Sequence, residues 1–192
     1  RRVLFRSYQA SEKWYYTAMA DLNTQFYKGY NYPDKSHYIS KFFAPAYSNI
    51  SLGMDFRPKS NYSLYLSPIA GKLTFVEDDY LSKEGAFGVD PGDRFRAEIG
   101  AYIKAKAEQK IMENVNLITS VDFFTPYDKQ FGNVDVNWDV LINMKINKYL
   151  SATLNTTLKY DNDVKTFNDE GEKHGAKVQF KEVLGIGVAY NF

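Results

Sequence analysis

The chain has 192 residues, enough for one domain, and its 24 Lys and Arg against 23 Asp and Glu give a formal net charge of +1. This balance argues against a broad basic surface for nucleic acid. The absence of cysteine excludes disulfides, thiolate metal sites and cysteine nucleophiles, and because no run of about 18 apolar residues occurs, no transmembrane helix is expected.

The first seven residues, RRVLFRS, differ in character from the rest of the chain. They contain neither a starting Met nor a signal peptide, and RVLFRS resembles the translation of a common sequencing-adapter oligonucleotide. We therefore interpret residues 1–7 as a non-native scar and leave them out of the fold prediction, and we assign residues 8–192 to a single, partial domain. The natural protein is expected to begin further upstream.

Alternation of apolar and polar residues, which places one kind on each face of a strand, predicts the first strands. The first covers residues 13–26, a length that suits a tilted membrane strand. A polar loop over 29–40 leads to a second strand at 46–57, and a short turn at 58–60 leads to a third. In this third strand, which starts at Tyr62, the apolar positions change parity after Pro68 and Gly71, so we predict a β-bulge there.

The second half of the chain continues the same pattern. A long polar loop over 77–94 precedes the most regular strand, 95–108, in which Ala and Ile alternate with charged and polar residues. After a short turn near 110–114, further strands are predicted at 115–123, 134–147 and 150–161, with a loop at 126–133 and a tight turn at 148–149. A long charged loop over 162–176 leads to the last strand, 183–192.

The connections between these strands are alternately short and long, as in outer-membrane β-barrels, which have short periplasmic turns and long outer loops. We therefore predict an all-β, antiparallel up-and-down transmembrane β-barrel, with about eight strands present, N-terminal strands missing and the C-terminus in the periplasm. An aromatic content of 17%, led by 16 Tyr and 14 Phe, agrees with the aromatic girdles of such barrels. The small Ala residues on the apolar face of strand 95–108 favour contact with lipid, because a protein core needs varied side-chain volumes.

The last strand, VLGIGVAYNF, has an apolar residue at every second position up to the C-terminus. This pattern resembles the C-terminal signal strand of bacterial outer-membrane β-barrels, in which a terminal Phe guides insertion by the assembly machinery. The resemblance implies two partners, the barrel assembly machinery and outer-membrane lipid. The residues expected to form the assembly signal are Leu184, Ile186, Val188, Tyr190 and Phe192.

The polar faces of the predicted strands carry charges that nearly cancel. A pore selective for one sign of ion would show a surplus of the opposite charge, so we expect a narrow lumen filled by ion pairs and water, with a conducting channel as the alternative. The expected lumen charges are Asp21, Asp55, Arg57, Arg96, Glu98, Lys104, Lys106, Glu108, Asp122, Asp135, Asp139, Lys145 and Lys159.

Few residues point to an enzyme or to a cofactor. The two histidines, His37 and His174, lie in predicted outer loops, and neither has a Ser nucleophile at a recognisable spacing. Residues 161–163 begin like a calcium loop, but Lys165 and Thr166 stand where an oxygen ligand and Gly are needed. Gly185 and Gly187 cannot belong to a nucleotide loop, because no helix can follow them. We expect no enzymatic activity, cofactor or metal.

From about Ser11 to Phe192 the chain resembles an uncharacterised, domain-of-unknown-function family of outer-membrane proteins from Bacteroidota. The segments that carry the resemblance are FFAPAYSNISLGMDFRP, YLSPIAGKLTF, VDVNWDVLINMKINKYLSATLNTTLKYD and the last strand. The family implies a barrel in the outer membrane and further sequence upstream, but no assigned activity.

The function expected is therefore a porin-like, transport or surface-interaction role of unassigned specificity, with the oligomeric state left open. A soluble β-barrel or sandwich that binds an apolar ligand is the alternative, and an outer-membrane barrel hydrolase is a remote one.

Overall fold

A computed structural model describes residues 2–30, 33, 36–128, 132–161, 165–167 and 173–188. Nine strands form one antiparallel sheet in which each strand pairs with its neighbours along the chain. The predicted all-β, antiparallel class is confirmed, and each of the eight predicted strands is present. The strands in sheet order are β1 (Arg2–Gln9), β2 (Trp14–Thr24), β5 (Ala46–Lys59), β6 (Tyr62–Phe75), β7 (Phe95–Met112), β8 (Val115–Pro126), β9 (Asp135–Lys145), β10 (Leu150–Tyr160) and β13 (Gln179–Val188).

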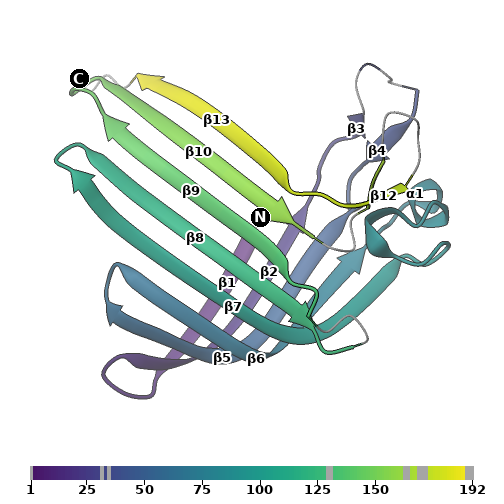
Figure 1. The fold of residues 1–192 in the computed structure, drawn as a ribbon, viewed down its shortest axis with the longest axis horizontal. Coiled ribbons are helices and arrows are strands. Elements are labelled where there is room, and N and C mark those ends of the chain that lie inside the picture. Colours follow the sequence, from purple (N-terminus) through teal and green to yellow (C-terminus); the bar gives the residue numbers. More distant parts are fainter. Residues whose placement is uncertain are drawn as a thin grey trace.

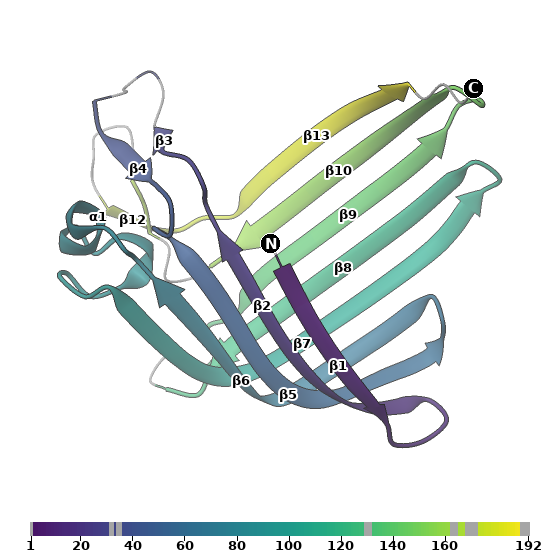
Figure 2. The ribbon, with the colours of Figure 1, turned by 180° about the vertical axis from the view of Figure 1, so that it is seen from behind.

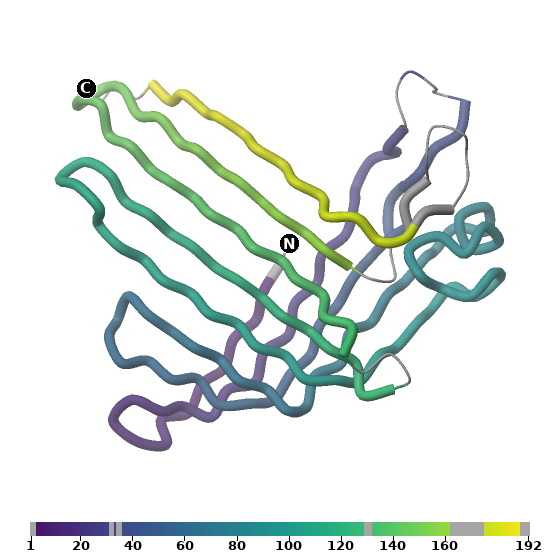
Figure 3. The backbone as a smooth tube through the Cα atoms, in the orientation of Figure 1, coloured from purple at the N-terminus to yellow at the C-terminus, as the bar shows by residue number. Residues whose placement is uncertain are grey.

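The sheet is rolled into a deep trough (Figure 1). Its two edges are β1 and β13, which do not pair with each other in the described part of the chain. Viewed from behind, β1 and β13 lie on opposite rims of the trough (Figure 2), and the backbone trace leaves its long side open (Figure 3). The sheet therefore has a concave and a convex face.

Strand β1 was not expected. Residues 1–7 were interpreted as a non-native scar and left out of the fold prediction. In the structure β1 pairs with β2 from Arg2 opposite Leu22 to Gln9 opposite Tyr15, which does not test the origin of this segment. Its sequence, RVLFRSYQ, does not alternate as the other strands do, because Val3, Leu4 and Phe5 are all apolar, but an extended segment can still pair with the open edge of a sheet. Arg6, however, pairs with Ala18 and so lies on the apolar, convex face.

The connections are sorted by length between the two ends of the trough, as predicted. The short ones, 10–13, 60–61, 113–114 and 146–149, lie at one end, which we call the turn end. The longer ones, 25–45, 76–94, 127–134 and 161–178, lie at the other, the loop end. Two small hairpins belong to this end, β3 (Gly29–Tyr30) with β4 (Tyr38–Ser40) and β11 (Lys165–Phe167) with β12 (Lys173–Ala176).

The segment predicted as a polar loop over 77–94 is instead a small folded cap. It contains the helix α1 (Asp79–Lys83) and the 3-10 turn η1 (Ala86–Gly88). Val76, Leu81 and Val89 are buried together with Ala44 from the connection between β4 and β5. Three apolar side chains widely spaced in a charged segment give no strand or helix periodicity, which is why the sequence pattern did not predict the cap.

The polar face of the sheet is buried and the apolar face is exposed. In β7, Glu98 and Tyr102 are only 5% and 6% exposed, whereas Ile99 and Ile103 are 67% and 41% exposed. A soluble sheet normally packs its apolar face on a core and turns the polar face to water, so this order is inverted. Other large apolar side chains exposed on the convex face are Tyr16, Leu22, Ile50, Leu52, Leu64, Ile69, Trp138, Leu184 and Ile186.

A β-bulge in β6 keeps the two faces in phase. The pairing of β6 with β7 shifts between Ser67 and Ala70, on either side of Pro68, and the pairing with β5 shifts at the same level. The one extra residue reverses the parity of the strand, so that Lys72 lies on the concave face and Leu73 on the convex one. The bulge predicted from the sequence is confirmed.

Two glycines permit the sheet to bend. A Cβ atom on Gly53 would lie 2.2 Å from the Leu66 carbonyl oxygen, and one on Gly100 would lie 2.0 Å from that of Thr125. In both places the backbone of the neighbouring strand approaches too closely for any side chain, as is typical of sharp bends in curved sheets. Gly71 has no such contact, because its nearest neighbour would lie at 3.9 Å.

We predict that Gly53→Ala and Gly100→Ala each lower the free energy of unfolding by about 1–3 kcal/mol, because the neighbouring backbone must move to admit the methyl group. Gly71→Ala is the matched control and should change it by no more than about 0.5 kcal/mol. Equilibrium unfolding in urea measures all three. Equal effects at Gly71 and Gly100 would contradict the role assigned to these close approaches.

Candidate functional site: the concave face

Aromatic side chains from several strands line the floor of the trough. The ring centroids of Phe5 and Tyr65 are 6.2 Å apart, and those of Tyr65 and Tyr102 are 6.1 Å apart. Tyr65, Tyr102 and Phe124 belong to a buried cluster with Met19, and the Tyr65 hydroxyl donates to Ser51 Oγ at 3.0 Å. The concave face thus combines an aromatic floor with polar groups that satisfy one another.

Six of the predicted lumen charges form three ion pairs in the structure. Each joins a buried or nearly buried carboxylate to a partly exposed cation on the same or the neighbouring strand. The pairs are Arg57 with Asp55 at 2.7 Å, Arg96 with Glu98 at 2.9 Å and Lys104 with Asp122 at 2.8 Å. Because the charges compensate locally, this face can be polar without carrying a strong net field.

Arg57 makes the most contacts of these cations. Its guanidinium donates to Ser7 Oγ at 3.2 Å and lies 4.6 Å from the centroid of the Tyr15 ring. Its partner Asp55 is 1% exposed, and Asp55 Oδ1 has no hydrogen-bond partner among the described residues. The compensation of the Asp55 charge therefore depends mainly on Arg57.

The remaining predicted lumen charges divide into two groups. Asp21 is buried and accepts from Asn49 at 3.1 Å, and Asp139 accepts from Thr157 Oγ1 at 2.7 Å. The other group is exposed and does not join the buried network described above. It consists of Lys106, Glu108, Lys145 and Lys159.

A further ionic cluster of this face centres on Lys72, which the predicted set of lumen charges did not include. The Lys72 ammonium contacts Asp135 at 2.6 Å and Asp161 at 2.9 Å, and it lies 5.9 Å from the centroid of the Phe124 ring. Asp135 belongs to the predicted set, whereas Asp161 follows β10. The change of parity after Pro68 is the sequence signal that places Lys72 on this face.

The described part of the expected assembly signal lies along β13. Leu184, Ile186 and Val188 are 66%, 73% and 77% exposed, and they pair with Leu154, Ala152 and Leu150 of β10. They therefore extend the convex apolar face to this edge of the sheet. Tyr190 and Phe192 lie outside the described residues.

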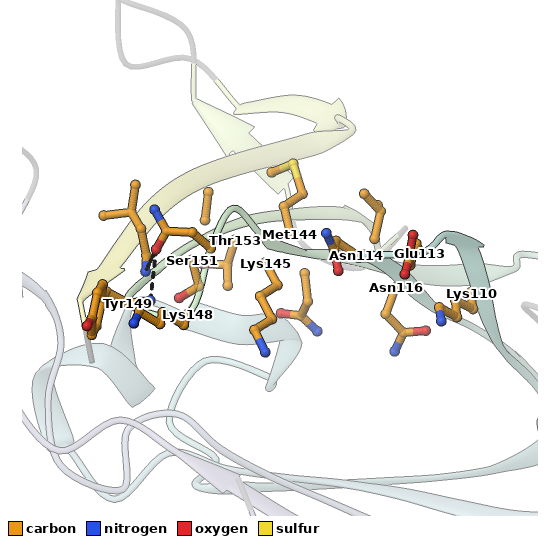
Figure 4. A pocket seen from close by; sticks show the side chains of 15 residues that line it. Lys110, Glu113, Asn114, Asn116, Met144, Lys145, Lys148, Tyr149, Ser151 and Thr153 are labelled. Atoms are coloured by element: carbon orange, nitrogen blue, oxygen red, sulfur yellow. Dashed lines mark hydrogen bonds between the residues drawn. The ribbon is translucent and has the colours of Figure 1, made fainter. Parts of the chain in front are cut away.

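A hollow of about 530 Å³ lies at the turn end, lined by the turns after β7 and β9. Polar side chains dominate the view in Figure 4, including Lys110, Asn116 and Lys145. The Asn147 side chain accepts from the backbone N–H groups of Tyr149 and Leu150, both at 2.8 Å, and so holds the turn after β9. These groups explain the hairpin geometry and make no acid–base constellation.

The cap at the loop end is held by Asp78. Its carboxylate accepts from the Leu81 backbone N–H at 2.9 Å, which caps α1, and it also binds Lys41 and the Tyr38 hydroxyl. Burial alone would raise the pKa of Asp78, but these hydrogen bonds outweigh burial and lower the pKa below its ordinary value of 3.8. The hydrogen bond to Asp78 raises the pKa of Lys41, and burial together with the same carboxylate raises that of Tyr38.

His37 lies at the loop end, in a segment that was predicted to be a loop. Its Nδ1 is 2.9 Å from Ser36 Oγ, and its ring stacks on Tyr80 with the centroids 6.4 Å apart. In a Ser-His-Asp triad the serine contacts Nε2 while the acid contacts Nδ1, so this contact does not have the triad geometry. Nothing is described for the His174 side chain.

Within the described residues no helix is long and apolar enough to cross a membrane. Nor is any group of three His, Asp or Glu side chains there arranged to hold a metal ion. No protein-family model, curated protein or solved structure significantly matches this chain.

We predict that the cap depends on pH through Asp78 and Lys41. A lowered carboxyl pKa contributes stability above pH 3.8 that is lost as the pH falls through the folded value, and a raised lysine pKa contributes stability that is lost as the pH rises above 10.5. Hydrogen exchange of the Leu81, Ser82 and Glu84 amides, corrected for intrinsic rates, should therefore be slowest between these limits.

Two substitutions separate the roles of Asp78. Asp78→Asn keeps a helix-capping acceptor but removes the ion pair, so the acid dependence of exchange should disappear while most protection remains. Asp78→Ala also removes the cap and should cost about 0.5–2 kcal/mol. An acid dependence that survives in Asp78→Asn would contradict the assignment.

Proposed function

We propose that this chain is part of an outer-membrane β-barrel with a porin-like, transport or surface-interaction role. The observation that carries the proposal is the inverted sheet, in which ionic and hydroxyl side chains are buried on the concave face and large apolar side chains are exposed on the convex one. A large apolar face is unfavourable in water, so an exposed apolar face of this extent indicates contact with an apolar environment. Lipid meets that requirement over the whole convex face.

Aromatic pairs at both ends of the convex face support a position across a bilayer. Phe75 and Phe95 lie 5.1 Å apart at the loop end, and Trp14 and Phe56 lie 4.8 Å apart at the turn end. Membrane barrels place aromatic girdles at both lipid–water interfaces. The sorting of short and long connections agrees with the same orientation, with the turn end in the periplasm and the loop end outside.

A position in the membrane would also require the two open edges of the sheet to be paired. Backbone groups at the edges of β1 and β13 cannot remain unpaired in hydrocarbon, so the complete barrel needs its edges closed. We propose closure by further strands of the natural protein, as the resemblance to the Bacteroidota outer-membrane family implies. In the same proposal, outer-membrane lipid and the barrel assembly machinery are the partners, and the last strand acts as the assembly signal.

The alternatives are less well supported by the geometry. A soluble barrel or sandwich that binds an apolar ligand would need an apolar interior, whereas Asp55, Glu98 and Asp122 occupy the concave face. A barrel hydrolase would need a nucleophile with a correctly oriented base, and the Ser36–His37 contact does not supply that orientation. The polar concave face favours passage or binding of a polar solute instead.

We predict that arginine on the convex face is costly only where the face meets hydrocarbon. Ile99 belongs to a cross-strand row with Ala20, Ile50 and Gly71, and this row lies between the two aromatic pairs. Ile99→Arg should destabilise the protein folded in lipid vesicles by about 2–4 kcal/mol.

The matched control is Gln109→Arg, on the same strand and the same face but at the turn end, where the cost near the interface should be about 0–1 kcal/mol. Unfolding by urea or guanidinium from vesicles measures both. In a water-exposed sheet neither substitution would change stability by more than about 0.5 kcal/mol, so equal, small effects would overturn the proposed function.

A further inference from the structure

We infer that Lys72 closes the lumen near its loop end by forming an ionic bridge across the concave face. This inference rests on the proposed function and names the constriction of the proposed pore. Lys72 extends from β6, and its two carboxylate partners belong to β9 and to the residue after β10. Strands β7 and β8 lie between them in the sheet.

Measured along the sheet surface, the strands joined by the bridge are farther apart than a lysine and an aspartate side chain can reach. Neighbouring strands lie about 4.7–4.9 Å apart, so the path along the sheet from β6 to β9 or β10 is roughly 14–19 Å. The lysine and aspartate side chains are shorter than this path, yet their charged atoms are 2.6 and 2.9 Å apart. The bridge must therefore run as a chord across the trough, over the Phe124 ring, and not along the floor.

The residues of the bridge have little access to solvent, and the cap lies against the same end of the trough. The side chains of Lys72 and Asp135 are only 13% and 18% exposed, although both reach into the concave space. On the loop side, the Arg96 guanidinium donates to the Gly88 carbonyl oxygen at 2.7 Å, which draws the cap against the same end of the trough. Two tethers, one ionic and one through the cap, thus reduce the opening at this level.

The charges of the bridge also predict its selectivity. One ammonium lies between two carboxylates, so replacement of the lysine removes the positive charge of the bridge and keeps both carboxylates. Rings of Asp or Glu favour cations in channels. Loss of Lys72 should therefore widen the passage and shift its preference toward cations.

The test compares Lys72→Ala with Lys13→Ala in planar bilayers. Lys13→Ala is the control, because it also removes one lysine charge but lies in the exposed turn between β1 and β2, away from the concave face. We expect Lys72→Ala to raise the single-channel conductance severalfold and to move the reversal potential toward cation selectivity, while Lys13→Ala leaves the conductance close to that of the wild type. Equal conductance of wild type and Lys72→Ala, including none in either, overturns the inference.

A second measurement does not depend on conduction. The chain has no cysteine, so nitroxides can be attached at Leu73 and Leu158, which lie on β6 and β10. The distance between the two nitroxides should lengthen, or its distribution broaden, in Lys72→Ala and stay unchanged in Lys13→Ala. Lys72→Met, which keeps the aliphatic stem over Phe124, provides a folded variant without the charge if Lys72→Ala is unstable, and an unchanged distance in both Lys72 variants overturns the inference.

The two proposals fail separately. If Ile99→Arg and Gln109→Arg prove equally mild, the membrane function itself fails. If these two differ as predicted while Lys72→Ala conducts like the wild type, only the constriction is wrong.

Discussion

The concave face can be buried only because its charges are compensated inside the trough. Asp55, Glu98 and Asp122 each have a cation within 3 Å, and Lys72 joins two further carboxylates. Without these partners the cost of burying each charge would exceed what the sheet can offset. Once the ionic groups face inward, strand alternation forces the apolar side chains outward, and the convex face then requires an apolar environment.

The curvature of the sheet brings the charged residues of the concave face close to one another. The close approaches at Gly53 and Gly100 and the bulge between Ser67 and Ala70 bend the sheet toward its polar face. The bend brings β6 near β9 and β10, so that Lys72 can reach Asp135 and Asp161. A flatter sheet with the same sequence would leave these charges apart and exposed, and would lose the proposed constriction.

Period-two alternation was enough to predict the strands, the bulge and the charged residues that form three ion pairs, because the face of each residue depends on local spacing. The Lys72 bridge could not be predicted in the same way, since it joins residues three and four strands apart and depends on curvature. The cap was missed because α1 has five residues and its core, Val76, Leu81 and Val89, has no periodicity. Residues 1–7 were left out of the fold prediction because of the origin assigned to their sequence. The pairing of β1 does not test that origin, although Arg6 on the convex face departs from the pattern of the other strands.

The orientation of the sheet in lipid can be measured directly along β7. Single cysteines introduced at successive residues from Ala97 to Ile103, each carrying a nitroxide, would report contact with oxygen in the bilayer and with a water-soluble relaxation agent. The account predicts an oxygen accessibility of period two, high at Ala97, Ile99, Ala101 and Ile103 and low at the residues between them. The opposite phase, or uniform access to the water-soluble agent, would contradict a lipid-facing convex surface.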